Sequence, residues 1–150
     1  MKKLMTTVAL ATLFSMGAAA QTPAQAQPQE ALSKDLATIQ GTWMLISLND
    51  QALADQGVEM ALSVSGNKYS QIVNGTVNET GTIKIDGTKK PMTFDLNIME
   101  GDDAGKLQLG IIEVTGDMAK VLLAAPGAGT RPADFMSNDG AVFFTAKKVK

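Results

Sequence analysis

Residues 60–75 read MALSVSGNKYSQIVNG, and this segment contains the pattern that recurs through most of the chain. In its first part, 60–65, apolar side chains alternate with small or polar ones, which is the period of a strand buried on one face. Gly66-Asn67 is a hairpin signal, and the strand expected from 68 to 74 ends at a second hairpin signal, Asn74-Gly75. The segment therefore predicts neighbouring antiparallel strands that are joined by tight turns.

The same alternation continues on both sides of this segment, with turn residues at intervals of about eight to twelve positions. Gly81 interrupts one of these strands, where a bulge or a bend is expected. Residues 35–40 are expected to form one helical turn capped by Asp35, and residues 50–59 a short helix or a long loop. The other predicted strands cover residues 41–49, 77–86, 92–98, 107–115, 118–124 and 141–148.

Strands joined mostly by hairpins, without a long helical pattern between them, predict an all-β fold. We expect an eight-stranded antiparallel up-and-down β-barrel with a short N-terminal helical turn, occupying residues 35–150. A β-sandwich is the alternative. The chain has the length of a single domain.

The N-terminus is predicted to be a targeting segment. Lys2 and Lys3 precede a short apolar run and a group of small residues, so residues 1–26 are expected to be a signal peptide and its cleavage region, cut after Ala20 or after Ala26. An amphipathic helix that stays attached is the alternative. Residues 27–34 are expected to form a flexible tether. The prediction is an exported protein, periplasmic or extracellular, without a stable membrane anchor.

Composition disfavours several kinds of chemistry. The chain has no Cys and no His, which excludes disulfides, thiolate nucleophiles and imidazole-based catalysis or metal binding. Loss of Lys2 and Lys3 with the leader would take the formal charge from −2 to −4, the wrong sign for a nucleic-acid partner. We expect no catalytic residues, no cofactor and no metal site, and a binding protein in place of an enzyme.

A barrel of this size either is filled by side chains or holds one small ligand. The predicted inward positions are almost all apolar, so a ligand would be a small hydrophobic molecule held by shape. The residues expected to contact it, in the lumen and at the mouth, are Trp43, Met60, Leu62, Tyr69, Phe94, Ile112 and Arg131. The alternative is a filled core, with the protein acting on an envelope protein through the loops at 50–59 or 125–140.

Arg131 has two interpretations. It lies in a long loop rich in glycine and proline, and its guanidinium is expected to pair with a carboxylate such as Asp95 or Asp134. In the other interpretation, Arg131 recognises an anionic ligand at the barrel mouth.

Gly41-Thr42-Trp43, at the head of the first predicted strand, resembles the G-x-W signature of lipocalins. Over about residues 36–148 the chain also resembles an uncharacterised lipocalin-like domain family abundant in exported proteins of planctomycete bacteria. The resemblance implies a barrel with a binding or interaction role in the cell envelope, and a cation across from Trp43, supplied by Arg131 or Lys147. The stretches that carry the resemblance are residues 36–43, 66–69, 81–86, 90–96, 101–106, 110–114, 116–117, 124–127 and 131–135.

Overall fold

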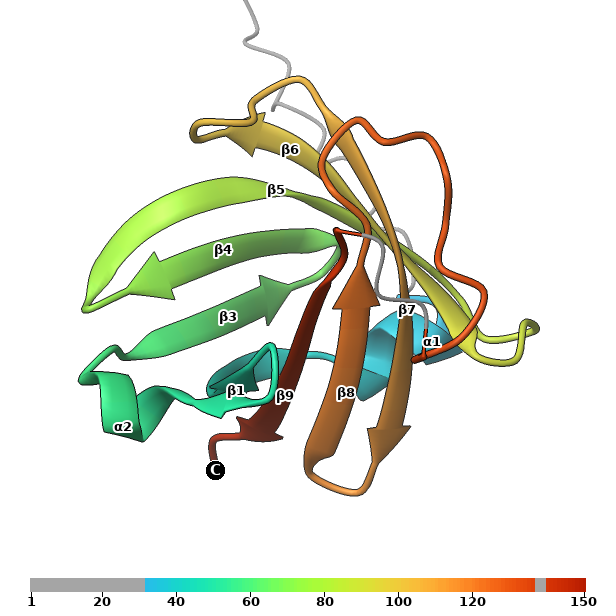
Figure 1. The fold of residues 1–150 in the computed structure, drawn as a ribbon. Helices are drawn as coiled ribbons and strands as arrows, with labels where there is room; N and C mark the ends of the chain where they lie inside the picture. Colours follow the sequence, from blue (N-terminus) through green and yellow to red (C-terminus); the bar gives the residue numbers. More distant parts are fainter. Residues whose placement is uncertain (1–31, 137–139) are drawn as a thin grey trace, which may run out of the picture.

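The chain folds into a closed antiparallel β-barrel, shown in Figure 1 as a computed structural model that describes residues 32–136 and 140–150. Each barrel strand pairs with the next one along the chain, and the last strand pairs back with the first. The barrel strands are β1 (Gly41–Leu48), β3 (Met60–Ser65), β4 (Lys68–Val73), β5 (Thr76–Asp86), β6 (Met92–Glu100), β7 (Leu107–Thr115), β8 (Met118–Leu123) and β9 (Val142–Lys148).

This topology confirms the prediction of eight strands in up-and-down order, and the two packed sheets of a sandwich are not formed. The segment expected to be a short helix or a long loop contains both a two-residue strand, β2 (Gln51–Ala52), and one helical turn, α2 (Leu53–Gln56). Leu53 is buried and holds this turn against the barrel. The predicted signal peptide, residues 1–26, lies outside the described residues.

The N-terminal helical turn is present as α1 (Lys34–Thr38), but its cap differs from the prediction. The hydroxyl of Ser33, not Asp35, accepts the capping hydrogen bond, from the backbone N–H of Leu36 at 3.2 Å. The carboxylate of Asp35 instead accepts a hydrogen bond from the backbone N–H of Gly87 at 2.9 Å. Asp35 therefore fastens α1 to the turn after β5, so that the helix lies against one end of the barrel.

Gly81 lies at an irregularity of the sheet, as expected. The pairing of β5 with β6 shifts register between Thr80 and Gly81, which confirms the predicted bulge. On its other side Gly81 pairs with Tyr69 of β4, whose side chain is buried. The absence of a side chain on the glycine leaves room for the Tyr69 ring.

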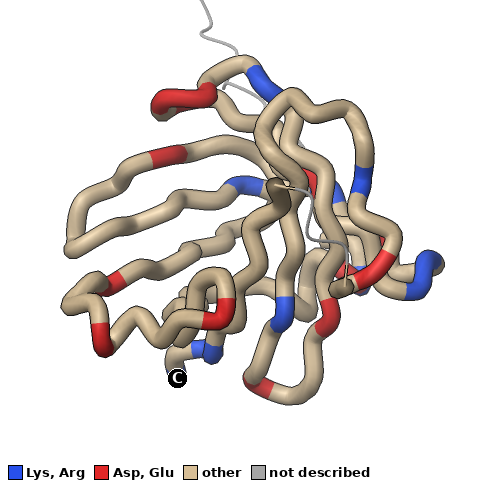
Figure 2. The backbone as a smooth tube through the Cα atoms, in the orientation of Figure 1, with Lys and Arg blue, Asp and Glu red and all other residues tan. Residues whose placement is uncertain are grey.

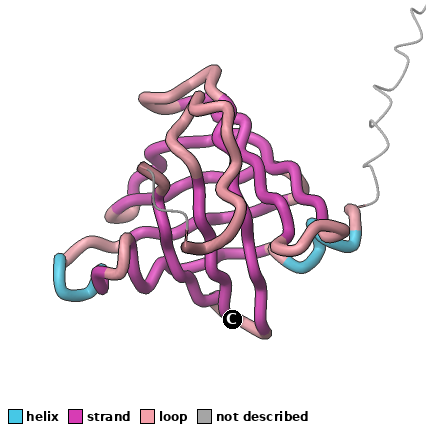
Figure 3. The backbone as a smooth tube through the Cα atoms, turned by 45° about the vertical axis from the view of Figure 1, so that its right-hand side comes forward, coloured by secondary structure: helices cyan, strands magenta, loops and turns pink. Residues whose placement is uncertain are grey.

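A small second apolar layer lies outside the barrel wall. Ile111 and Leu122 are cross-strand partners that are buried, yet they do not belong to the core cluster inside the barrel. The connection between β8 and β9 passes along the outer wall (Figure 3), and its Phe135 packs edge-on against Phe143, with ring centroids 6.4 Å apart. This connection therefore contacts the barrel at Phe135, whereas most of its other described residues are exposed.

Candidate functional site

The end of the barrel interior next to α1 is filled by side chains. Trp43 is 3% exposed, and its indole Nε1 donates a hydrogen bond to the backbone oxygen of Ile39 at 2.8 Å. The buried core residues at this end, which do not line the cavity in the other half of the barrel, are Ile39, Trp43, Val64, Ile83, Ile112, Ala119, Val121 and Ala146.

The cation across from Trp43 is Lys148. Its Nζ lies 5.7 Å from the centroid of the indole ring, within the range of a cation–π contact. The expectation that Arg131 or Lys147 would take this place was wrong. Arg131 is held elsewhere, and Lys147 is exposed, because alternate residues of β9 face opposite sides of the barrel wall.

The other half of the interior contains a cavity of about 250 Å³. Its walls are mostly apolar, with a small number of polar side chains at intervals. The lining residues are Leu45, Leu48, Met60, Ala61, Leu62, Tyr69, Gln71, Glu79, Phe94, Leu96, Asp103, Gln108, Leu123, Pro126, Val142 and Phe144.

Two of the polar side chains in this wall, Tyr69 and Glu79, are hydrogen-bonded to each other. The phenol of Tyr69 donates a hydrogen bond of 2.7 Å to Oε1 of Glu79. Burial, together with the hydrogen bond and the negative charge of Glu79, raises the pKa of Tyr69 above its ordinary value. Tyr69 is therefore neutral at physiological pH. Gln71 lies directly opposite Glu79 in the ladder of β4 and β5, so both side chains face the cavity.

The seven residues predicted to contact a ligand occupy three different places. Four of them line the cavity, namely Met60, Leu62, Tyr69 and Phe94. Trp43 and Ile112 belong to the filled end of the core, and Arg131 lies in the connection on the outer wall. The structure thus brings together four of the six aliphatic and aromatic residues of the predicted set and leaves Trp43, Ile112 and Arg131 apart from them.

Besides Asp103 in the loop after β6, three polar lining residues on strands, Gln71, Glu79 and Gln108, were not among the predicted contacts. A signal for them was present, because each lies two residues from an inward position on its strand, such as Tyr69 for Gln71 and Gly81 for Glu79. The expectation that inward positions are apolar led to their omission.

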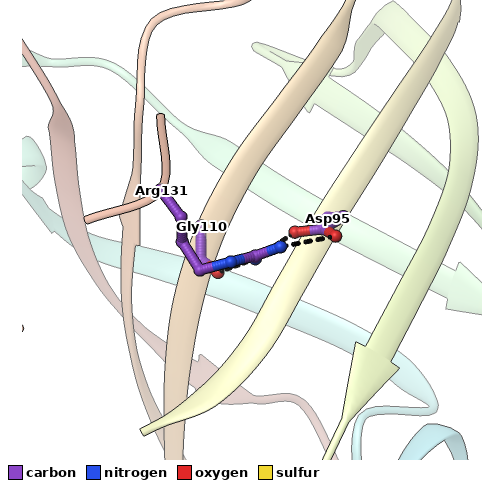
Figure 4. Close-up of polar contacts among 3 residues, drawn as sticks. All are labelled: Asp95, Gly110 and Arg131. Carbon is purple, nitrogen blue, oxygen red and sulfur yellow. Dashed lines mark hydrogen bonds and ion pairs between the residues drawn. The ribbon is translucent and has the colours of Figure 1, made fainter. Parts of the chain in front are cut away.

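Arg131 binds the outer face of the barrel wall (Figure 4). Its guanidinium donates to both carboxylate oxygens of Asp95, with Nη2 to Oδ2 at 2.9 Å, and Nη1 also donates to the backbone oxygen of Gly110 at 2.8 Å. Of the two carboxylates considered from the sequence, Asp95 is the partner. The hydrogen bond to Asp95 raises the pKa of Arg131, which keeps the guanidinium charged.

Replacing Arg131 by methionine is expected to lower the free energy of unfolding by about 1–2 kcal/mol, because Asp95, 15% exposed, loses a bidentate charged partner. The double variant Arg131→Met with Asp95→Asn should recover part of this loss. Urea unfolding of the unmodified protein, the two single variants and the double variant measures the coupling energy between the two side chains. A coupling energy of zero would contradict a stabilising role for this pair.

Within residues 32–136 and 140–150, no helix is long and apolar enough to span a membrane. The same residues contain no group of three or more His, Cys, Asp or Glu side chains arranged to hold a metal ion.

Sequential strand order, closure of the last strand on the first and a cavity in one half of the interior define an eight-stranded barrel of the lipocalin-like class. No protein-family model and no curated protein matches the chain. Among solved structures it is similar to Echinococcus granulosus fatty-acid-binding protein 1, with 14% identity, a TM-score of 0.43, and coverage of 76% of this chain and 99% of that one. The strand pairing of this chain itself defines the barrel.

Proposed function

We propose that the barrel binds one small, mostly apolar molecule in the cavity beside Tyr69. The observation that carries this proposal is the cavity itself, whose walls are formed largely by aliphatic and aromatic side chains. An apolar cavity of about 150 Å³ is sufficient to bind benzene. The cavity here, at about 250 Å³, has room for a single ring with substituents or for a short acyl chain.

The size of the cavity also limits the affinity. It is smaller than the roughly 300 Å³ at which typical pockets for drug-sized ligands begin. Burial of about 250 Å² of ligand surface contributes about 6 kcal/mol at about 25 cal/mol per Å². We therefore expect dissociation constants of roughly 10–100 μM for simple apolar ligands.

Binding is tested with n-octanol and protein labelled with ¹³C at the methionine methyl groups. Met60 lines the cavity, so its methyl resonance should shift as n-octanol is added. Met118, which is 38% exposed and does not line the cavity, serves as the internal control and should not shift. If the methyl resonance of Met60 did not shift at saturating n-octanol, the proposal would be contradicted.

A cavity-filling variant tests the location of binding. Leu45 lines the cavity, whereas its neighbour Ile46 is 43% exposed, so Leu45→Trp and Ile46→Trp place the same side chain inside and outside the barrel. We expect Leu45→Trp to weaken n-octanol binding by about tenfold or more, since the indole occupies the space of the ligand. Ile46→Trp should bind as the unmodified protein does. Equal binding by both variants would place the ligand elsewhere.

We further propose that the domain is exported to the periplasm or the medium and belongs to the lipocalin-like family of exported planctomycete proteins. These proposals are supported by the pattern of residues 1–26 and by the stretches of resemblance. N-terminal sequencing of the protein recovered from the envelope fraction or the medium should begin at Gln21 or Gln27. An intact Met1 in that material would contradict export with cleavage.

The alternative proposal, an interaction protein that acts through its loops, receives less support. It required a filled core and exposed apolar side chains at 50–59 or 125–140. In the described residues of those two loops, the large apolar side chain that is exposed is Met136, at 88%, while Leu53 is buried.

A further inference from the structure

Of the polar side chains that line the cavity, Tyr69, Glu79, Asp103 and Gln108 present hydrogen-bond acceptors, whereas the amide of Gln71 offers donor as well as acceptor atoms. The carboxylates of Glu79 and Asp103 line the cavity, and a carboxylate has acceptor oxygens alone. The phenol of Tyr69 uses its proton in the bond to Glu79, which leaves its oxygen lone pairs as further acceptors. The residues that line the cavity include neither Lys nor Arg.

Gln108 adds a fourth acceptor, and the orientation of its amide is determined by its hydrogen-bond partner. Its amide Nε2 donates a hydrogen bond of 2.9 Å to the backbone oxygen of Ala124, which can only accept, so the amide oxygen Oε1 faces away from this bond. The residue is 8% exposed and lines the cavity. No fully buried side-chain polar atom in the described residues lacks a hydrogen-bond partner. Oε1 has no such partner, so it keeps some accessible surface, on a side chain that lines the cavity.

The nearby cations do not themselves line the cavity, and each already has an acidic or aromatic partner, which for Lys106 is the cavity-lining Asp103. Lys106 pairs with Asp103 at 2.7 Å on the exposed loop after β6, where Figure 2 shows acidic positions beside a basic one. Arg131 is held by Asp95 on the outer wall, and Lys148 lies over Trp43 at the filled end. A carboxylate ligand inside the cavity would thus face Glu79 without a counter-ion, which disfavours its burial.

We propose that the ligand of this cavity carries a head group that donates hydrogen bonds, a primary amine or an alcohol, on a short apolar body, and that the cavity rejects carboxylates of the same length. The apolar body lies against the aliphatic and aromatic walls, and the head group contacts Glu79 and Oε1 of Gln108. This inference deepens the proposed function and depends on it.

The test compares n-octylamine, n-octanol and n-octanoate by isothermal titration calorimetry at neutral pH, where the amine is protonated. The apolar chain is the same in all three compounds, so differences in affinity report on the head group. We expect n-octylamine to bind about tenfold more tightly than n-octanol, because a hydrogen bond to a charged group is stronger than one between neutral groups. Binding of n-octanoate should be weaker than that of n-octanol by about tenfold or more.

The variant Glu79→Gln tests whether Glu79 is the residue that makes n-octylamine bind more tightly than n-octanol. It keeps an acceptor for Tyr69 and removes the charge, so n-octylamine should lose about tenfold in affinity while n-octanol changes little. Glu113→Gln is the matched control, since Glu113 is exposed on the outer face of β7 and pairs with Lys120 at 3.5 Å. It should leave both affinities unchanged.

A second variant keeps the test decisive if Glu79→Gln folds poorly. Gln108→Met has similar volume and removes the acceptor oxygen, so binding of both n-octylamine and n-octanol should weaken. Binding of n-octanoate equal to or tighter than that of n-octylamine would overturn the head-group inference and leave the proposed function in place. Failure of all three compounds to bind would overturn the proposed function itself.

Discussion

Replacing Gly81 by alanine is expected to lower the free energy of unfolding by about 3 kcal/mol, near the upper end for overpacking of a core. A Cβ atom at this position would lie 2.1 Å from the backbone oxygen of Asn97 and 2.8 Å from Cε1 of Tyr69. Neither neighbour can move freely, because Asn97 belongs to the ladder of β5 and β6 and Tyr69 is buried. Urea unfolding followed by the fluorescence of Trp43 measures the change.

Gly116→Ala is the control for the prediction at Gly81. Gly116 has a φ of +62° in the turn between β7 and β8, and nothing lies within 4 Å of the position its Cβ would take. Its replacement introduces only the backbone strain of a left-handed residue, about 1–2 kcal/mol. Equal stability losses at Gly81 and Gly116 would show that the close approach of Asn97 and Tyr69 is not the cause.

Removal of the Trp43 side chain is the second large effect that we expect. Trp43→Ala should cost about 3–5 kcal/mol, since it deletes a fully buried indole at the filled end of the barrel and leaves a void there. The chain contains one Trp, so the unfolding of this variant is followed by circular dichroism. A loss below about 1 kcal/mol would contradict a structural role for this end of the core.

Trp43→Phe separates packing from hydrogen bonding at the same position. It retains an aromatic ring but removes the bond from Nε1 to the backbone oxygen of Ile39, which joins β1 to the end of α1. We expect a loss of about 1–2 kcal/mol from the unpaired oxygen and the smaller ring. If Trp43→Phe were as destabilising as Trp43→Ala, the hydrogen bond would be the larger contribution.

The strands were predictable because local signals mark both their faces and their ends. The segment predicted from 60 to 65 is β3, with the same bounds, since alternation ends at the turn of Gly66-Asn67. Asn74-Gly75 likewise separates β4 from β5. The alternation of apolar and polar side chains along a strand, like a hairpin turn, depends on only a few neighbouring residues. Both can therefore be recognised from the sequence alone.

The site was less predictable because it depends on residues that are distant in the chain. Whether Arg131 would pair with Asp95 or Asp134 is decided by the path of a long loop over the barrel wall. The volume of the cavity depends on how side chains from all the strands fit together, including the absence of a side chain at Gly81. The alternation of side chains along a strand predicts whether a residue points into or out of the barrel, but it does not predict how much of the interior the inward side chains leave unfilled.

Closure of the barrel requires a strongly non-local strand pairing. Hairpins such as β3–β4 join residues that are close in sequence, whereas the ladder of β1 and β9 places Trp43 opposite Lys148. Forming that ladder requires a loop through almost the whole domain, which slows folding relative to the hairpins. Without β9, both β1 and β8 would present open edges, so any state of the chain in which β9 is undocked is exposed to strand addition by other chains.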